Sequence, residues 1–177
     1  MRSFSLALLV AVLALAASPA FAWVGDVVAV SDGDTLIVAR EDGTREKVRL
    51  FGIDCPESAW KGRWEAQPFW RKAKGFVEDL FAGEGGRRVT IWERGKSYDR
   101  LVAGVIILDD GAILQERIVA AGYAWVDPVY CKKSVDRECG NWMELEQQAA
   151  RERRGLWRAL DWKEKPVAPW KWRKGER

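Results

Sequence analysis

The stretch VRLFGIDCPE, residues 48–57, joins a mostly apolar run to an acidic end. Its first part, 48–53, predicts a β-strand, and Pro56 ends the strand because proline has no backbone N–H to donate. Two apolar runs upstream predict strands at 24–30 and 36–40. Three strands with short connections form an antiparallel meander. The connecting turns are residues 32–35 and 41–44.

The elements downstream of the meander determine the fold class. Apolar side chains fall on one face of a helix predicted over 65–81, which Gly83 ends. The complete order is β-β-β-α-β-β-α-α, which predicts an α+β fold: a five-stranded OB-fold β-barrel with three α-helices. The other predicted elements are strands at 89–92 and 101–108 and helices at 113–121 and 142–154.

The composition excludes several kinds of catalytic site. The 177 residues include eleven tryptophans and no histidine, with 29 Lys and Arg against 26 Asp and Glu. A Ser-His-Asp triad, a Cys-His pair and a zinc site with His ligands are therefore excluded. An enzyme with this sequence would depend on carboxylates, Arg, Lys, Tyr or Cys side chains, or a hard metal ion.

The first 22 residues have the pattern of a secretory signal peptide. Arg2 precedes a short apolar run, and Ala20-Phe21-Ala22 forms a small-residue cleavage site. The run is too short to span a membrane, so we expect an exported, periplasmic or extracellular protein without a stable membrane anchor. The alternative is a buried N-terminal helix. The folded domain is expected over residues 23–157.

Export would give the three cysteines different roles, because oxidising compartments permit disulfides. Cys131 and Cys139 flank a polar stretch and are predicted to form a disulfide. Cys55 is left over, between Asp54 and Pro56. It is either a reactive thiol or an inert, semi-buried residue. The absence of a histidine to activate it favours the inert residue.

The C-terminal tail, residues 158–177, differs from the domain in composition. It is basic and rich in Trp and Pro. One interpretation is an extended segment that docks on the domain through its tryptophans, and the other is an extra nucleic-acid contact by stacking and charge. We favour docking.

Four acidic residues lie near the ends of neighbouring strands. Asp32 and Asp34 belong to the first turn, and Asp54 and Glu57 follow the third strand. In a meander the third strand returns beside the first turn, which brings Asp54 close to Asp34. Two carboxylates with few other protein ligands suit Ca²⁺, which also accepts carbonyl and water oxygens. Each motif taken alone could instead be a common turn or a helix cap.

Two arginines complete this candidate site. Arg49 lies on the third strand, and Arg100 precedes the apolar run that begins at Leu101. Arginine binds phosphate with paired donors. A cation and two arginines at one pocket are typical of phosphoryl transfer and need no histidine.

This ordered set of motifs resembles the staphylococcal nuclease, or thermonuclease, family over about residues 24–157. The resemblance implies an OB-fold barrel with three helices and Ca²⁺-dependent cleavage of DNA and RNA to 3′-phosphate products. The matching runs are DGDT (32–35), VRL (48–50), GIDCPE (52–57), YDRLVA (98–103) and GLW (155–157).

The resemblance also implies a role for each matching residue around the metal. Asp34, Asp54 and the main-chain carbonyl of Cys55 correspond to calcium ligands. Asp32 corresponds to a carboxylate that orients metal-bound waters. Glu57 corresponds to the residue that positions or deprotonates the attacking water.

Other matching residues would bind the substrate. Arg49 and Arg100 correspond to the pair that binds the phosphate and stabilises the transition state, and Tyr98 and Tyr130 to aromatic residues beside the nucleotide. The chain departs from the family at two places. Pro128 stands where the type enzyme has another tyrosine, and Asp99 replaces the usual glycine.

Two other functions fit parts of the sequence. A non-catalytic OB-fold protein that binds single-stranded nucleic acid would not need Asp34, Asp54 and Glu57. A secreted, calcium-stabilised structural protein would not need the two arginines. We therefore expect a nuclease, and its single domain favours a monomer.

Overall fold

A computed structural model describes residues 22–83, 86–97, 101–131, 137–159 and 166–176. Five strands form a closed barrel in the order β1-β2-β3-β6-β5. All neighbours are antiparallel except β3 and β6, which run parallel. The expected OB-fold, α+β class is therefore confirmed. The strands are β1 (Ala22–Asp32), β2 (Thr35–Arg40), β3 (Arg45–Leu50), β5 (Arg88–Ser97) and β6 (Leu101–Leu108).

The barrel interior is filled by aliphatic side chains from the strands. Residues alternate between buried and exposed along the first half of β1, as expected for a strand with one face on the core. Full burial of branched side chains stabilises the barrel by roughly 1.5–3 kcal/mol each. Those buried inside it include Leu36, Val38, Val48, Leu50, Ile91 and Ile106.

The strand expected over 48–53 is divided in two, which corrects the sequence prediction. Gly52 has a φ of +74°, and this turn separates β3 from β4 (Ile53–Asp54). Strand β4 leaves the barrel and pairs with β7 (Trp125–Val126), which the sequence did not predict. A Cβ at Gly52 would lie 2.8 Å from the ring of Trp142, so glycine is required for space as well as for conformation. The turn thus directs Asp54 away from the barrel wall.

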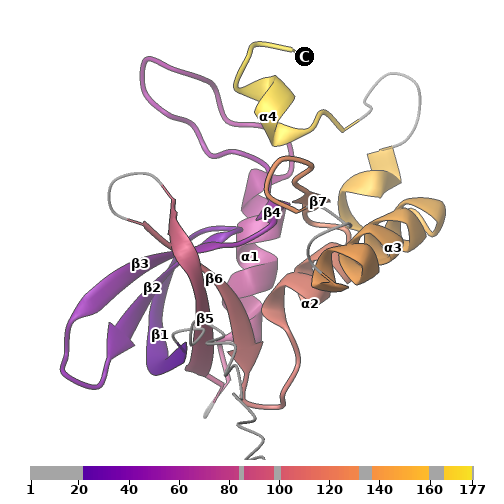
Figure 1. Cartoon of the computed structure of the whole chain (residues 1–177). Coiled ribbons are helices and arrows are strands. Elements are labelled where there is room, and N and C mark those ends of the chain that lie inside the picture. Colours follow the sequence, from indigo (N-terminus) through magenta and orange to yellow (C-terminus); the bar gives the residue numbers. More distant parts are fainter. Residues whose placement is uncertain (1–21, 84–85, 98–100, 132–136, 160–165, 177) are drawn as a thin grey trace, which may run out of the picture.

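Helices α1 (Trp70–Leu80) and α2 (Leu114–Ala120) pack on the barrel, and α3 (Arg137–Arg151) packs on α2 and β7 (Figure 1). Helix α1 begins five residues later than expected, because Pro68 is followed by Phe69 with a left-handed φ of 70°. Helix α3 begins earlier than the expected start at 142, and the left-handed Arg153 lies just past its end. A disulfide joins Cys131 to Cys139 in α3, the pairing expected from their spacing. None of the described helices is long and apolar enough to cross a membrane.

The described part of the tail packs on the domain. It contains a short helix, α4 (Pro169–Trp172), instead of the wholly extended segment expected, and a 3-10 turn (Gly155–Ala159) lies at the domain's end. The buried indole of Trp172 donates to the carbonyl of Glu65 at 2.9 Å. Ala168 packs with Trp125 and Leu156 in a second apolar cluster. Residues 1–21 and 160–165 lie outside the described residues, and so does all of the expected signal peptide except Ala22, the first residue of β1.

Glu146 on α3 generates a prediction about stability and pH. Burial raises the pKa of Glu146 from 4.5 to about 7, although the Val126 N–H donates to its carboxylate. Because this pKa is higher in the folded chain, the free energy of unfolding should fall as pH rises from 4.5 to about 7. In Glu146→Gln the free energy of unfolding should fall by about 2 kcal/mol less over this pH range than in the parent.

Urea unfolding at pH 5 and pH 8 measures this difference. The matched control is Glu144→Gln, an exposed carboxylate on the same helix, which should keep the parent's pH dependence. An unchanged pH dependence in Glu146→Gln would contradict the prediction.

Candidate active site

The topology of the barrel brings the expected acidic residues together. Thr35, the first residue of β2, pairs with Arg49 of β3, and the Leu50 N–H donates to the carbonyl of Asp34 at 2.8 Å. The end of β3 therefore lies beside the turn between β1 and β2. Just beyond it, the Cys55 N–H donates to Asp34 Oδ2 at 2.7 Å. These contacts place Asp54 next to Asp34, as the meander predicts.

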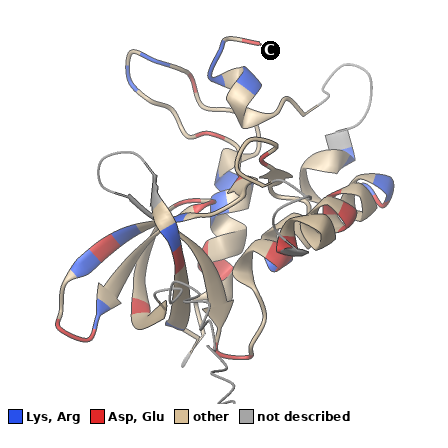
Figure 2. Cartoon of the chain, viewed as in Figure 1, with Lys and Arg blue, Asp and Glu red and all other residues tan. Residues whose placement is uncertain are grey.

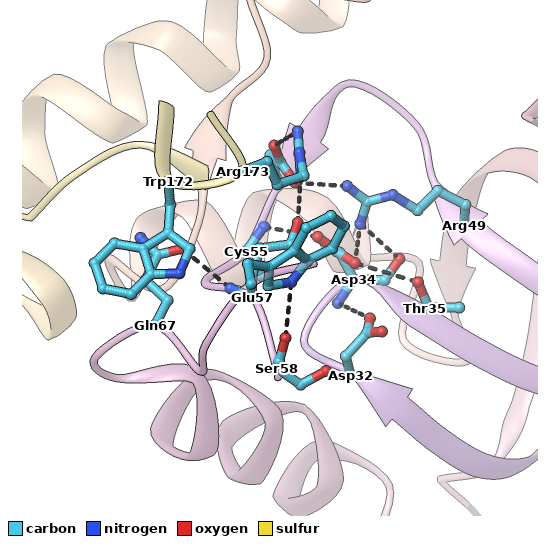
Figure 3. A network of polar contacts seen from close by, with 12 residues as sticks. Asp32, Asp34, Thr35, Arg49, Cys55, Glu57, Ser58, Gln67, Trp172 and Arg173 are labelled. Atoms are coloured by element: carbon cyan, nitrogen blue, oxygen red, sulfur yellow. Dashed lines mark hydrogen bonds and ion pairs between the residues drawn. The ribbon is translucent and has the colours of Figure 1, made fainter. Parts of the chain in front are cut away.

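One guanidinium joins the two aspartates, and Figure 3 shows Arg49 reaching toward Asp34. Arg49 Nη2 lies 2.7 Å from Asp54 Oδ1, and its Nη1 forms an ion pair with Asp34 Oδ1. The Asp34 residue is 6% exposed and Asp54 is 0% exposed. Buried carboxylates are costly unless they are paired and hydrogen-bonded, and Arg49 supplies both kinds of contact. Arg49 thus compensates two buried negative charges at once.

The donor set fits a hard cation with few protein ligands. Among the residues that the structure describes, no group of three or more His, Cys, Asp and Glu side chains is arranged to hold a metal ion. Asp34 and Asp54 would supply two carboxylate ligands, and main-chain carbonyl and water oxygens would supply the others. Ca²⁺ accepts such mixed oxygen ligands, whereas soft metals prefer thiolate or imidazole.

The side chain of Cys55 does not belong to the donor set. It lies under the turn that contains Asp34, where a Cβ added at Gly33 would be 3.0 Å from the sulfur. Burial raises the pKa of the Cys55 thiol well above its usual value, so the sulfur remains protonated. A protonated thiol is a poor metal ligand and a poor nucleophile. These properties agree with the inert residue favoured by the sequence.

Glu57 lies close to the paired aspartates but has its own set of contacts. Its backbone N–H donates to Gln67 Oε1 at 3.1 Å, and its carboxylate forms an ion pair with Arg173. Burial raises the pKa of Glu57, and the positive charge of Arg173 opposes that rise. Gln67 and Arg173 were both missed by the sequence analysis.

The other predicted site residues either take part in backbone hydrogen bonds or lie outside the described residues. Asp32 ends β1, where its Oδ1 accepts the Asp34 N–H at 3.4 Å and so holds the turn. Tyr130 is 56% exposed in the turn after β7, and its N–H donates to Asp127. Tyr98 and Arg100 lie outside the described residues.

A family model described as staphylococcal nuclease homologue matches residues 47–159, which include Arg49, Asp54 and Glu57. The chain belongs to the staphylococcal nuclease family. The family match begins after Asp34 and ends before the part of the tail that carries Arg173.

Individual relatives extend this similarity beyond the matched region. Over 150 residues the chain is 33% identical to a protein of Escherichia coli O157:H7 named as an uncharacterized endonuclease, with 84% of each chain covered. Over 180 residues it is 30% identical to a protein of Shigella flexneri named micrococcal nuclease, with 94% of this chain and 90% of that protein covered. It is also 35% identical over 81 residues to the thermonuclease of Staphylococcus intermedius, with 46% and 47% covered. Membership of the staphylococcal nuclease family and these similarities support nuclease activity in general.

The burial of Cys55 generates a prediction about its reactivity. Iodoacetamide should fail to alkylate the folded protein, because the thiol is both inaccessible and protonated. In urea without reductant, the same reagent should add once per chain, since the other two cysteines form a disulfide. Mass spectrometry measures both results. Rapid alkylation of Cys55 in the folded protein would contradict this description of the site.

Proposed function

We propose that this protein hydrolyses DNA and RNA in a Ca²⁺-dependent reaction that leaves 3′-phosphate products. The observation that carries the proposal is the joining of Asp34 and Asp54 by Arg49, with Glu57 beside them. A phosphodiester is an anion, and this site combines a place for a cation with a phosphate-binding arginine. The resemblance of the motifs supports the same reaction.

The proposed metal site consists of Asp34, Asp54 and the main-chain carbonyl of Cys55. When bound, Ca²⁺ would supply positive charge to a phosphate oxygen and screen the substrate from the carboxylates. Asp32, which already holds the turn by accepting the Asp34 N–H, would orient waters at this site.

Glu57 would position the attacking water or take its proton. Its carboxylate is partly buried, and its backbone is fixed by two hydrogen bonds with Gln67. In-line attack at phosphorus needs a water held at one angle, and a fixed carboxylate provides that orientation.

Arg49 would bind the phosphate oxygens together with Arg100. Its guanidinium is already held at the candidate metal site, so its orientation is set before the substrate binds. Donors placed where negative charge develops stabilise the transition state more than the substrate. Arginine stays protonated, so its contribution would be electrostatic and it would not donate the proton to the leaving group.

We further propose that the protein acts as a monomer outside the cytoplasm, in the periplasm or the medium. The pattern of residues 1–22 supports export. The Cys131–Cys139 disulfide also supports it, because such bridges persist in oxidising compartments.

The direct test is to incubate the purified protein with single- and double-stranded DNA and with RNA, in Ca²⁺ or in chelator. We expect cleavage in Ca²⁺ alone, with phosphate at the 3′ ends of the products. Binding without cleavage would select the non-catalytic OB-fold alternative. The absence of both would reject a nucleic-acid substrate.

Substitutions test the assigned residues. Arg49→Ala and Glu57→Gln should each lower the rate of DNA cleavage about 100-fold or more, because each removes a group that acts on the reacting phosphate or water. Circular dichroism at the assay temperature checks that both variants are folded, and Arg49→Ala should unfold at a lower temperature because it leaves Asp34 without its ion pair.

Arg45→Ala and Glu144→Gln are the matched controls. Arg45 is an exposed arginine on the same strand as Arg49, and Glu144 is an exposed carboxylate on α3. Both controls should cleave at the parental rate. Near-parental rates in Arg49→Ala and Glu57→Gln as well would show that the site is elsewhere.

A further inference from the structure

A guanidinium from the C-terminal tail reaches the candidate active site. Arg173 lies directly after α4, and its Nη2 is 2.8 Å from Asp54 Oδ2 while its Nη1 is 3.3 Å from Asp54 Oδ1. The same Nη1 forms an ion pair with Glu57 Oε1. One planar fork therefore binds two carboxylates that the proposed function places at the metal and at the attacking water (Figure 3).

The segment that carries Arg173 is fixed to the domain by contacts with Gln67 and with the Glu57 carboxylate. Gln67 Nε2 donates to the carbonyl of Val167 in the tail at 2.5 Å. The same Gln67 accepts the Glu57 N–H through Oε1, and its own N–H donates to the Glu57 carbonyl at 2.8 Å. The tail thus contacts the Glu57 backbone through Gln67 and the Glu57 carboxylate through Arg173.

The charges at the site are compatible with Arg173 and a metal ion together. Among the described side chains of this cluster, the carboxylates of Asp34, Asp54 and Glu57 pair with the guanidinium groups of Arg49 and Arg173, and a fourth carboxylate, that of Asp32, accepts the Asp34 N–H beside them. The carboxylates exceed the guanidiniums by two charges, which one divalent cation would balance. Removing Arg173 would leave an additional negative charge beside the phosphate.

We propose that residues 166–173 form part of the active site and that Arg173 is a positioning residue for Glu57 and Asp54. This role rests on the proposed function. Arginine's fork fixes the separation of the two carboxylates, which a lysine's single ammonium group cannot do equally well. The family match ends at residue 159, so Arg173 lies outside the matched region.

The surroundings of the segment are suited to a polyanionic substrate. Lys and Arg residues occur on the loop between Glu57 and α1 and on the tail around α4, and Figure 2 shows them on the same side of the molecule. The tail therefore adds positive charge at the side of the site where Arg173 enters.

The test compares Arg173→Ala and Arg173→Lys with the parent at saturating Ca²⁺ and over a range of DNA concentrations. Arg173→Ala should lower kcat about 10- to 100-fold with KM within about twofold of the parent, since misplacing a catalytic group slows chemistry more than binding. Arg173→Lys should recover part of the loss, because the charge remains but the fork is lost. Arg45→Ala, which removes an exposed arginine on β3 away from the tail, should behave as the parent does.

Two results would overturn the positioning role. One is a kcat in Arg173→Ala equal to that of Arg45→Ala. The other is an unchanged kcat at saturating Ca²⁺ with activation at lower Ca²⁺ concentration, which would make Arg173 a competitor of the cation. A parent that does not cleave would instead reject the proposed function, and the catalytic role with it.

A metal-free measurement tests the contact without activity. Thermal unfolding in chelator would compare Arg173→Ala, Glu57→Gln and the double variant. If the ion pair forms in solution, the double variant should lower Tm by less than the two single changes together. Additive changes would show that Arg173 does not hold Glu57.

Discussion

Arg49 joins two buried carboxylates, and the geometry of the whole site depends on that ion-paired cluster. Asp34 comes from the turn between β1 and β2, whereas Asp54 lies on β4 beyond the Gly52 turn. Neither carboxylate could remain buried and ionised without a partner, so their shared arginine holds the turn, β3 and β4 in one arrangement. The fold has to compensate these buried charges. A nuclease needs charged groups of both signs to bind a cation and a phosphate.

Much of the barrel could be predicted from the sequence, because its strands have local signals. The strand expected at 101–108 matches β6, and the meander placed Asp54 beside Asp34. The short β4–β7 sheet could not be predicted, because two-residue strands carry no periodicity and form only through tertiary pairing. The late start of α1 has a similar origin, since Phe69 has a left-handed backbone conformation and packs against the second apolar cluster.

The candidate site was predictable only where its residues belong to ordered motifs. Asp34, Arg49, Asp54 and Glu57 lie within 24 positions of one another, and their motifs are adjacent to predicted strand ends. Arg173 is 116 positions from Glu57, in a tail whose basic and aromatic composition fits both docking, which we favour, and nucleic-acid contact. The structure shows that the tail docks and that the docked segment brings an arginine to the carboxylates of Asp54 and Glu57.

The most direct test of the central claim is calorimetric titration of Ca²⁺ into the parent and into Asp54→Asn in the absence of substrate. If Asp34 and Asp54 form the metal site, the parent should bind one Ca²⁺ per chain, and the variant should lose most of that affinity because a carboxylate ligand becomes a neutral amide. Unchanged Ca²⁺ binding in Asp54→Asn would contradict the account and place the metal elsewhere in the protein.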